Sequence, residues 1–438
     1  MGVTDLWTFG IAARANRTTT RRYVPTRLVL GFAGLIAFAG LSGCSSTIAN
    51  PSALSSPVLS TEASATTSPT VEPMPSPSPK LAPKFASTGS LNESRMNATA
   101  TLLQDGKVLI VGGQANVGLI EHLYSSAELY DPSTGKFTAT GSMTRARTSH
   151  TATLLSDGRV LIAGGYGCGG SKACSPDALD HTTERPQTTA ELFDPSTGKF
   201  TPTGSMSAAR SFAVATRLTD GRVLVVAGDA AESAELYDPS KGRFSPTGAS
   251  LIQISDNDPT ATLLPDGEVL VTGTTRSGPA AEIYDPKAGE FKGISYALAP
   301  GAAASAQYSG QPVERTAPQT ATLLGDGRVL LFESGYLEVF DPAAGTFAPA
   351  GFMAAPGQWF FPSATLLGDG QVLCIGSISA TSPDPAGLYN PATGPHSITS
   401  MLAGRAFETT TLLPDGSVLI AGGAADWANA TSSAELFK

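Results

Sequence analysis

The sequence predicts an all-β protein built from one four-stranded unit repeated seven times, and three observations support this. First, two short apolar runs joined by an Asp-Gly pair occur seven times, with the aspartates at Asp105, Asp157, Asp220, Asp266, Asp326, Asp369 and Asp415. Second, a third short run containing an aromatic residue follows each pair, as in residues 127–130. Third, the last copy stops after its third run, whereas an unmatched strand precedes the first copy.

Each copy predicts four antiparallel strands, and residues 150–165 show how it begins. Two apolar runs joined by a short link containing glycine form a β-hairpin. A variable loop leads to the third run, and the turn at residues 131–135 leads to a fourth that begins at Lys136. Because the runs are continuously apolar rather than alternating, we expect sheets that are covered on both faces.

The unmatched strand at the start is expected to complete the last copy. Residues 83–91 align position for position with residues 135–143, which form the fourth strand of the first copy. Such pairing closes a ring and leaves no free sheet edge. The predicted fold is therefore a seven-bladed β-propeller of four-stranded antiparallel blades over residues 83–438, with Phe85 beside the strand of Phe437.

The repeats resemble those of the kelch family, which includes the central domain of galactose oxidase. The double glycine of that family is present as Gly112-Gly113, Gly164-Gly165 and Gly422-Gly423, and an aromatic residue ends each third strand. The sequence departs from the family in two ways. Four of the seven copies replace the glycine pair, and the fourth-strand tryptophan usual in kelch repeats is phenylalanine here in most copies.

The residues before the repeats predict export and a lipid anchor. Residues 28–43 are apolar but short for a membrane span, and they follow five arginines, as in a signal peptide. The motif Leu-Ser-Gly-Cys at residues 41–44 resembles a bacterial lipobox, which implies lipid attachment at Cys44 after removal of residues 1–43. A plain signal peptide or an uncleaved anchor is the alternative. Residues 44–82 are rich in Ser, Thr, Pro and Ala and are expected to be a disordered tether.

Charge and cysteine content limit the partners. Of 28 basic and 37 acidic residues, six and three precede residue 84, which leaves 22 and 34 and a net charge of −12 on the repeats. We therefore expect no nucleic-acid partner. Cys168 and Cys174 share one loop and are expected to form a disulfide in an exported protein, with metal binding as the weaker alternative. Cys374 is expected to be buried.

The predicted strand order assigns function to one face of the disc. The Asp-Gly turns and the third-to-fourth turns lie on one side, the short-turn face, whereas all long insertions lie on the other, the long-loop face. Trp359 and Trp427 map to the long-loop face in neighbouring blades. They are candidates for stacking on a sugar ring or anchoring a protein partner, and packing beneath their own loops is the alternative.

An arginine ring is a second candidate site on the same face. Arg95, Arg147, Arg210 and Arg405 occupy one repeat position, which is Asp256 in the fourth copy and Trp359 in the sixth. Arginine forks could bind a carboxylate, sulfate or phosphate group. Because a residue that recurs in most blades is more simply structural, fastening of the blades is the favoured alternative, and the breaks at Asp256 and Trp359 are the better site markers.

These features predict a binding module rather than a defined enzyme. The chain is expected to be a monomer, anchored outside the cytoplasm of a bacterium by lipid alone, that recognises a glycan or a cell-envelope protein. No catalytic residue, metal ligand or cofactor is assigned, because the four histidines show no spacing that pairs them and the recurring glutamates suggest scaffolding. The alternative is a carbohydrate-active enzyme, resembling kelch sugar epimerases or copper oxidases, that acts in the central channel.

Overall fold

The computed structural model describes residues 84–117, 120–168, 184–229, 233–251, 259–275, 278–296, 320–333, 335–353, 360–377, 386–398, 400–424 and 429–438. All belong to one compact unit, Ser78–Lys438, and only the fold of that unit is described. Every regular element in these residues is a β-strand. Within the same residues, no helix is long and apolar enough to cross a bilayer.

The described residues form seven four-stranded antiparallel sheets, which is the number that the repeats predict. We number these blades 1 to 7 along the chain. The strands of the first four blades, from first to fourth, are as follows. Blade 1 contains β2 (Thr99–Leu102), β3 (Val108–Val111), β6 (Ala127–Asp131) and β7 (Lys136–Ala139); blade 2 contains β9 (Thr151–Leu154), β10 (Val160–Ala163), β13 (Ala190–Asp194) and β14 (Lys199–Pro202); blade 3 contains β15 (Val214–Arg217), β16 (Val223–Val226), β17 (Ala234–Asp238) and β18 (Arg243–Pro246); blade 4 contains β19 (Thr260–Leu263), β20 (Val269–Thr275), β21 (Gly278–Asp285) and β22 (Glu290–Ile294).

The remaining three blades have the same order. Blade 5 contains β23 (Thr320–Leu323), β24 (Val329–Glu333), β25 (Tyr336–Asp341) and β26 (Thr346–Phe352); blade 6 contains β27 (Phe360–Leu366), β28 (Val372–Ser377), β29 (Ala386–Asn390) and β30 (Gly394–Ser397); blade 7 contains β31 (Thr409–Leu412), β32 (Val418–Ala421), β33 (Ala434–Phe437) and β1 (Phe85–Ser87). Blade 7 thus takes its fourth strand from the start of the unit.

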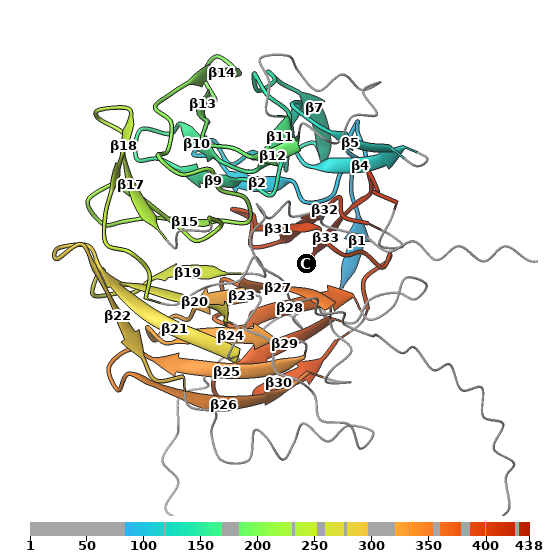
Figure 1. Cartoon of the computed structure of the whole chain (residues 1–438). Coiled ribbons are helices and arrows are strands. Elements are labelled where there is room, and N and C mark those ends of the chain that lie inside the picture. Colours follow the sequence, from blue (N-terminus) through green and yellow to red (C-terminus); the bar gives the residue numbers. More distant parts are fainter. Residues whose placement is uncertain are drawn as a thin grey trace, which may run out of the picture. The chain divides into compact units, whose positions relative to one another are not determined.

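The blades are arranged around a common axis. The first strand of each blade contacts the first strands of the blades before and after it, and β31 of blade 7 contacts β2 of blade 1. Figure 1 shows these first strands around the centre and the fourth strands toward the outside, with the colours following the chain around the ring. Blade 7 joins the two ends of the unit, since Phe85 pairs with Phe437 as predicted.

The local chemistry of each hairpin explains its shape. In blade 1 the Asp105 carboxylate accepts a hydrogen bond from the Lys107 N–H at 3.1 Å, and Gly106 has φ +84°, a left-handed conformation that favours glycine. The strand that follows, β3, is buried along its whole length. Apolar cores between adjacent blades, such as the one joining Val108 and Leu419, cover both of its faces.

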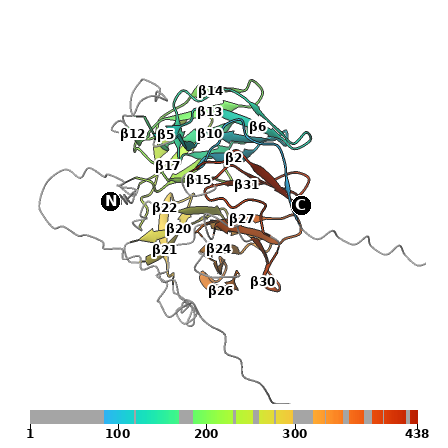
Figure 2. The ribbon, with the colours of Figure 1, turned by 90° about the vertical axis from the view of Figure 1, so that its right-hand side faces the viewer.

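Two insertions add strands to the long-loop face. In blade 1, β4 (Gln114–Val117) and β5 (Ile120–Leu123) form a hairpin between the second and third strands. In blade 2, β11 (Tyr166–Cys168) and β12 (Glu184–Pro186) pair with β8 (Arg147–Thr148) in a small three-stranded sheet. Figure 2 shows β5 and β12 on the side of the unit opposite to the C-terminus. The sequence predicts long loops in both places, and the structure has paired strands instead.

Candidate functional site

The four arginines of the predicted ring are buried inside the blades. Their side chains are 0% exposed, and each pairs with the glutamate of the third strand in its own blade, as Arg147 does with Glu191 at 3.1 Å. Arg147 also donates to the main-chain oxygens of Gly164 at 2.7 Å and Thr189 at 3.0 Å. Burial lowers the pKa of Arg147, and Glu191 opposes that shift.

The main chain at the same positions joins neighbouring blades. The carbonyl oxygen of Arg147 in blade 2 accepts a hydrogen bond from the Gly113 N–H of blade 1 at 3.0 Å. The carbonyl oxygens of Arg210 and Arg95 accept equivalent bonds from the second glycines of blades 2 and 7. A Cβ atom on Gly112 would lie 2.6 Å from the Arg147 oxygen, which explains the glycine pair. These contacts favour the fastening role over direct ligand binding, because no guanidinium surface is left exposed.

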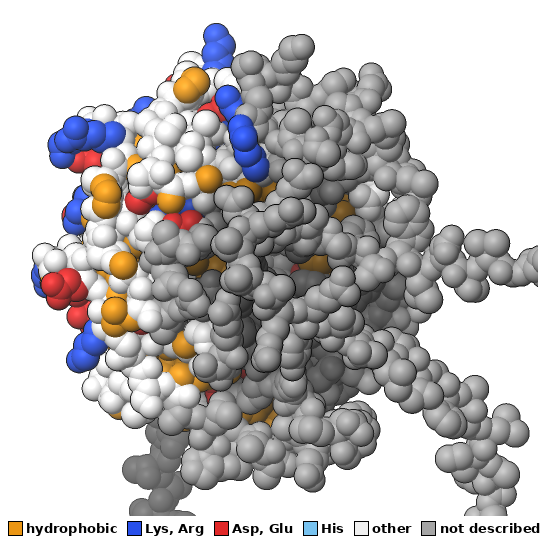
Figure 3. All heavy atoms as spheres, in the orientation of Figure 1, with side chains coloured by type: hydrophobic (Ala, Val, Ile, Leu, Met, Phe, Trp, Pro, Cys, Tyr) orange, Lys and Arg blue, Asp and Glu red, His pale blue; other side chains and the backbone are white. Residues whose placement is uncertain are grey.

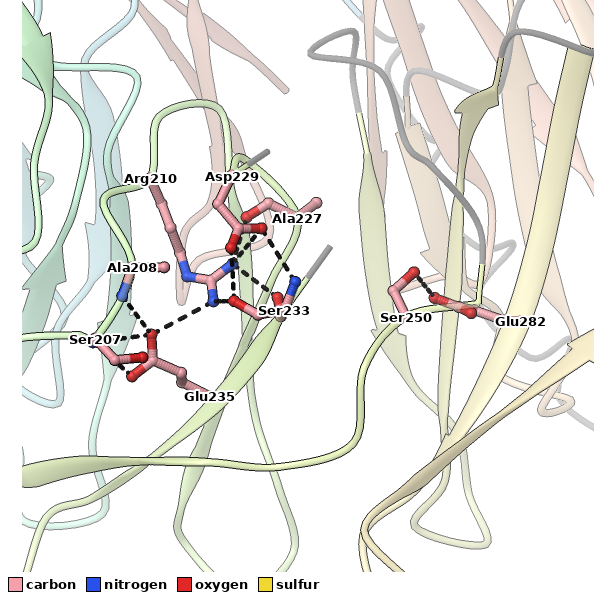
Figure 4. A network of polar contacts seen from close by, with 9 residues as sticks. All are labelled: Ser207, Ala208, Arg210, Ala227, Asp229, Ser233, Glu235, Ser250 and Glu282. Carbon is pink, nitrogen blue, oxygen red and sulfur yellow. Dashed lines mark hydrogen bonds and ion pairs between the residues drawn. The ribbon is translucent and has the colours of Figure 1, made fainter. Parts of the chain in front are cut away.

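The pattern is broken in blades 4 to 6. In blade 4, Glu282 accepts hydrogen bonds from the Ser250 hydroxyl at 2.5 Å and the Leu251 N–H at 2.8 Å. Figure 4 shows this contact beside the complete network of blade 3, in which Arg210 lies between Asp229 and Glu235. In blade 5, Glu338 accepts a hydrogen bond from the Tyr296 hydroxyl at 2.7 Å. Blade 6 has Gly387 in place of the glutamate and Trp359 in place of the arginine, so both charges are lost together.

An inner rim of left-handed residues precedes the first strands on the long-loop face. Asn97, Ser149, Phe212 and Phe407 hold one repeat position, two residues after each arginine, with φ between 52° and 60°. Main-chain bonds connect them across blades, from the Asn97 N–H to the Phe407 oxygen at 3.2 Å and from the Phe212 N–H to the Ser149 oxygen at 3.0 Å. These contacts hold the rim in a backbone conformation that asparagine tolerates better than phenylalanine.

Phe212 is the most unusual member of this rim. Its side chain is 44% exposed, although a left-handed phenylalanine carries a conformational cost that burial does not fully offset here. Sequence reasoning missed this residue. The available signal was a bulky aromatic at a position that holds asparagine or serine in blades 1 and 2. Its exposure and strain make Phe212 the best described candidate for ligand contact on the long-loop face.

His150 lies next to this rim at the start of β9 but is only 6% exposed. Its Nε2 atom is 2.9 Å from the Thr99 hydroxyl, and its Nδ1 atom has no hydrogen-bond partner among the described residues. Burial, with a smaller contribution from the Arg147 charge, lowers the pKa of His150 to about 3. The imidazole is therefore neutral at physiological pH and lies beneath the surface, where an added ligand cannot contact it directly.

Several predicted site residues lie outside the described residues. These are Trp359, Trp427, Asp256, Cys174 and Cys44, so their roles stay predictions. Cys168 belongs to β11, and its side chain is not described. Cys374 is buried and free, and burial raises the pKa of its thiol. Among the residues that the structure describes, no group of three His, Cys, Asp or Glu side chains is placed to hold a metal ion.

Comparisons with known proteins agree with this architecture. Residues 97–144 match the model of the Kelch motif. A fungal alcohol oxidase of the AA5 family, solved in complex with copper, superimposes with a TM-score of 0.57 at 15% identity, covering 81% of this chain and 75% of the oxidase chain. Streptogramin B lyase superimposes with a TM-score of 0.55 at 13% identity, covering 81% and 98%. No curated protein sequence matches the chain.

At these identities the two solved structures show the fold alone. The matched motif includes the glycine pair Gly112-Gly113 and the third strand of blade 1, which are the residues that carry the resemblance in the sequence. The repeat chemistry, the seven sheets and the superpositions agree with one another. The chain folds as a β-propeller, and its first blade matches the Kelch motif.

Proposed function

We propose that this protein is a lipid-anchored binding module that recognises a glycan or a cell-envelope protein through its long-loop face. One observation carries the proposal: the inner rim of that face presents Phe212, an aromatic side chain that is both strained and 44% exposed. The left-handed conformation itself recurs along the rim, but a bulky aromatic side chain adds strain to it, and such strain often marks functional positions. The extra strands of blades 1 and 2 enlarge the same face.

A neutral sugar is the ligand chemistry that this rim fits best. The arginines next to it are buried in ion pairs and are not available to bind an anionic group. Many of the Lys, Arg, Asp and Glu side chains that Figure 3 shows on the described surface lie at its outer margin, near β14, β18 and β22, and others lie further in, near β12 and β15. An exposed aromatic ring can stack on the apolar face of a sugar, while polar residues at the same position in other blades, Asn97 and Ser149, can contribute hydrogen bonds to its hydroxyls.

A glycan array tests the ligand class. The wild-type chain should bind a subset of neutral glycans, and Phe212→Asn should lose at least about tenfold in affinity, because a central aromatic anchor carries a large share of binding energy. Phe352→Ala is the matched control, since it removes a phenylalanine that is 37% exposed on the outermost strand of blade 5. Equal binding by wild type and Phe212→Asn would remove Phe212 from the site.

The tryptophans and the anchor are tested separately. Trp359→Ala with Trp427→Ala should weaken the same glycans if these residues belong to the site, and an envelope pull-down with the same variant tests a protein partner. For the anchor, Cys44→Ser should move the protein from the membrane fraction to the soluble fraction. Retention of the Cys44→Ser variant in membranes would contradict lipid attachment at this residue.

The second candidate is a carbohydrate-active enzyme that works near the axis of the ring. Its support is that both similar solved structures are named as enzymes, an alcohol oxidase and a lyase. The decisive assay follows peroxide formation and sugar turnover with and without added copper. Turnover by the wild type that is lost in a rim variant would favour catalysis, whereas binding without turnover would favour the module.

A further inference from the structure

Adjacent blades are held together near their outer edges by a repeated Thr-Gly contact, which we call the latch. At the junction of blades 3 and 4, the Thr247 hydroxyl lies 2.7 Å from the Tyr284 hydroxyl, and the Gly248 N–H donates to the Gly289 oxygen at 2.9 Å. The glycine is required, since a Cβ on Gly248 would lie 2.4 Å from that oxygen. The glycine bond recurs at the junctions of blades 7 and 1, 1 and 2, and 2 and 3.

The latch is missing between blades 4 and 5. Ile294 and Ser295 stand where Thr247 and Gly248 stand one blade earlier, and Phe340 replaces the tyrosine. None of these side chains can reproduce the hydroxyl pair, and a serine does not fit the close approach of the glycine. A cavity of about 350 Å³ lies at this junction, with Ile294, Phe291 and Phe340 among its apolar lining residues.

A second link between blades is also lost at this junction. In blade 3, the residue after the Asp-Gly turn is Arg222, which reaches the Pro286 oxygen of blade 4 at 3.5 Å. Lys107, Arg159 and Arg328 hold the same position in other blades, but in blade 4 it is Glu268. A carboxylate cannot donate to the carbonyl of the next blade, so Glu268 cannot make the contact that Arg222 makes, and the latch is also missing at this junction.

The rim of the groove is acidic because blade 4 carries two charge reversals. Glu290 begins its fourth strand, where blades 1, 2 and 3 have Lys136, Lys199 and Arg243. Asp266, Glu268, Asp285 and Glu290 all line the cavity. Burial and the two aspartates raise the pKa of Glu268, which is the expected response of a carboxylate crowded by like charges. Lys287 and Lys292 offset only part of this charge.

We propose that the groove between blades 4 and 5 docks a basic segment of a partner protein, with one apolar side chain of that segment on the floor and flanking lysines or arginines beside Glu268 and Glu290. Charge complementarity selects this occupant, since a carboxylate rim repels acidic peptides and anionic lipid surfaces alike. The site is independent of the long-loop face. No latch bond is found among the described residues at the junctions of blades 5 and 6 or of blades 6 and 7 either, but only in blade 4 do acidic side chains stand at the two basic positions.

The test uses the full chain in detergent and a fluorescent nine-residue amidated peptide with a central phenylalanine flanked on each side by two lysines. Anisotropy should show saturable binding that weakens with added salt. Glu268→Arg with Glu290→Lys gives blade 4 the basic residue types of blades 1 to 3 and should weaken binding at least about tenfold. A peptide with serine in place of phenylalanine should also bind more weakly, since it leaves the floor empty.

Two further variants distinguish the contribution of the open groove to peptide binding from the contribution of its acidic side chains. Ile294→Thr, Ser295→Gly and Phe340→Tyr together rebuild the latch without changing charge, and this variant should lose peptide binding while keeping its fold by circular dichroism. Lys107→Glu with Lys136→Glu places equivalent acids at the junction of blades 1 and 2, which keeps its glycine bond to Gly198, and should create no second peptide site. The proposal is overturned if the peptide binds the variant with Glu268→Arg and Glu290→Lys, or the variant with the rebuilt latch, as tightly as it binds wild type.

Discussion

Removing one partner of a buried arginine–glutamate pair is the perturbation that best separates a fastener from a ligand site. Arg147→Met keeps much of the side-chain volume but removes every donor of the guanidinium. The main-chain oxygens of Gly164 and Thr189 then lose their shared partner, and Glu191 keeps only its bond from the Thr144 N–H at 2.8 Å. The variant therefore leaves a carboxylate in a place where its side chain is 2% exposed.

The expected loss in the free energy of unfolding follows from these lost contacts. Breaking a buried ion pair by removing one partner costs about 3–5 kcal/mol, because the remaining charge stays desolvated. Replacing both partners by apolar side chains is much less costly and is often close to neutral. Arg147→Met with Glu191→Leu should accordingly be more stable than Arg147→Met alone. Blade 6 already carries a natural double loss of this kind, with Trp359 and Gly387 at the two positions.

The assay is a double-mutant cycle in urea, followed by far-ultraviolet circular dichroism and tryptophan fluorescence. Coinciding transitions from the two probes would justify a single free energy of unfolding for each variant. The coupling energy between Arg147 and Glu191 should be about 2–3 kcal/mol, as for contacting residues of one network. Binding of the glycans found on the array is measured in parallel with the same four proteins.

A clear result would refute the reasoning. If Arg147→Met unfolds at the wild-type urea concentration but has lost glycan binding, the arginine is a ligand contact and not a fastener. If the double variant is destabilised by the sum of the two single variants, the pair is not coupled. Either outcome would require that the side chain leaves its buried position in solution.

The remaining predictions concern three other buried or strained residues. His150→Ala should reduce the acid sensitivity of the fold. Because folding lowers the pKa of His150 from its ordinary value of 6.5 to about 3, wild type loses stability as pH falls from 6.5 to 3, by up to about 5 kcal/mol. The difference between wild type and variant in urea midpoints across this pH range checks this prediction. Phe212→Asn should raise the free energy of unfolding by about 1 kcal/mol, since it relieves a left-handed phenylalanine, and a fall in stability would show that ring packing outweighs the strain. Cys374 should not react with a thiol reagent in the native chain. In a Cys44→Ser variant, unfolding without reductant should expose this one thiol if Cys168 and Cys174 are joined as predicted, whereas three reactive thiols would argue against that disulfide.

The sequence predicts the blades well because their chemistry is local and repeated. Each Asp-Gly pair forms its turn with contacts two residues apart, as between Asp105 and Lys107, so the turn needs no information from the rest of the chain. The pairing of Phe85 with Phe437 is predictable from the alignment of residues 83–91 with residues 135–143. Repetition turns a weak local signal into a strong one.

The site is less predictable, because its features arise once and depend on neighbouring blades. The strands β4 and β5 lie in an insertion whose sequence no other blade repeats, so no internal alignment could reveal their pairing. The left-handed conformation of Phe212 depends on a main-chain bond to Ser149 in the preceding blade, 63 positions earlier in the chain. The missing latch could not be predicted from the sequence, because the latch contacts are known only from the structure. Ile294 and Phe340 become informative once the residues that make these contacts at other junctions have been identified.

The pairing of β1 with β33 has a practical consequence for engineering. The Lys84 N–H donates to the Lys438 oxygen and the Lys438 N–H to the Lys84 oxygen, both at 3.0 Å, so the two ends of the propeller are hydrogen-bonded neighbours. A short glycine-rich linker could therefore join them covalently, and the chain could be reopened at any exposed Asp-Gly turn. Such circular permutants would present a fused cargo from a chosen blade of the short-turn face, with the inner rim left unobstructed on the opposite side.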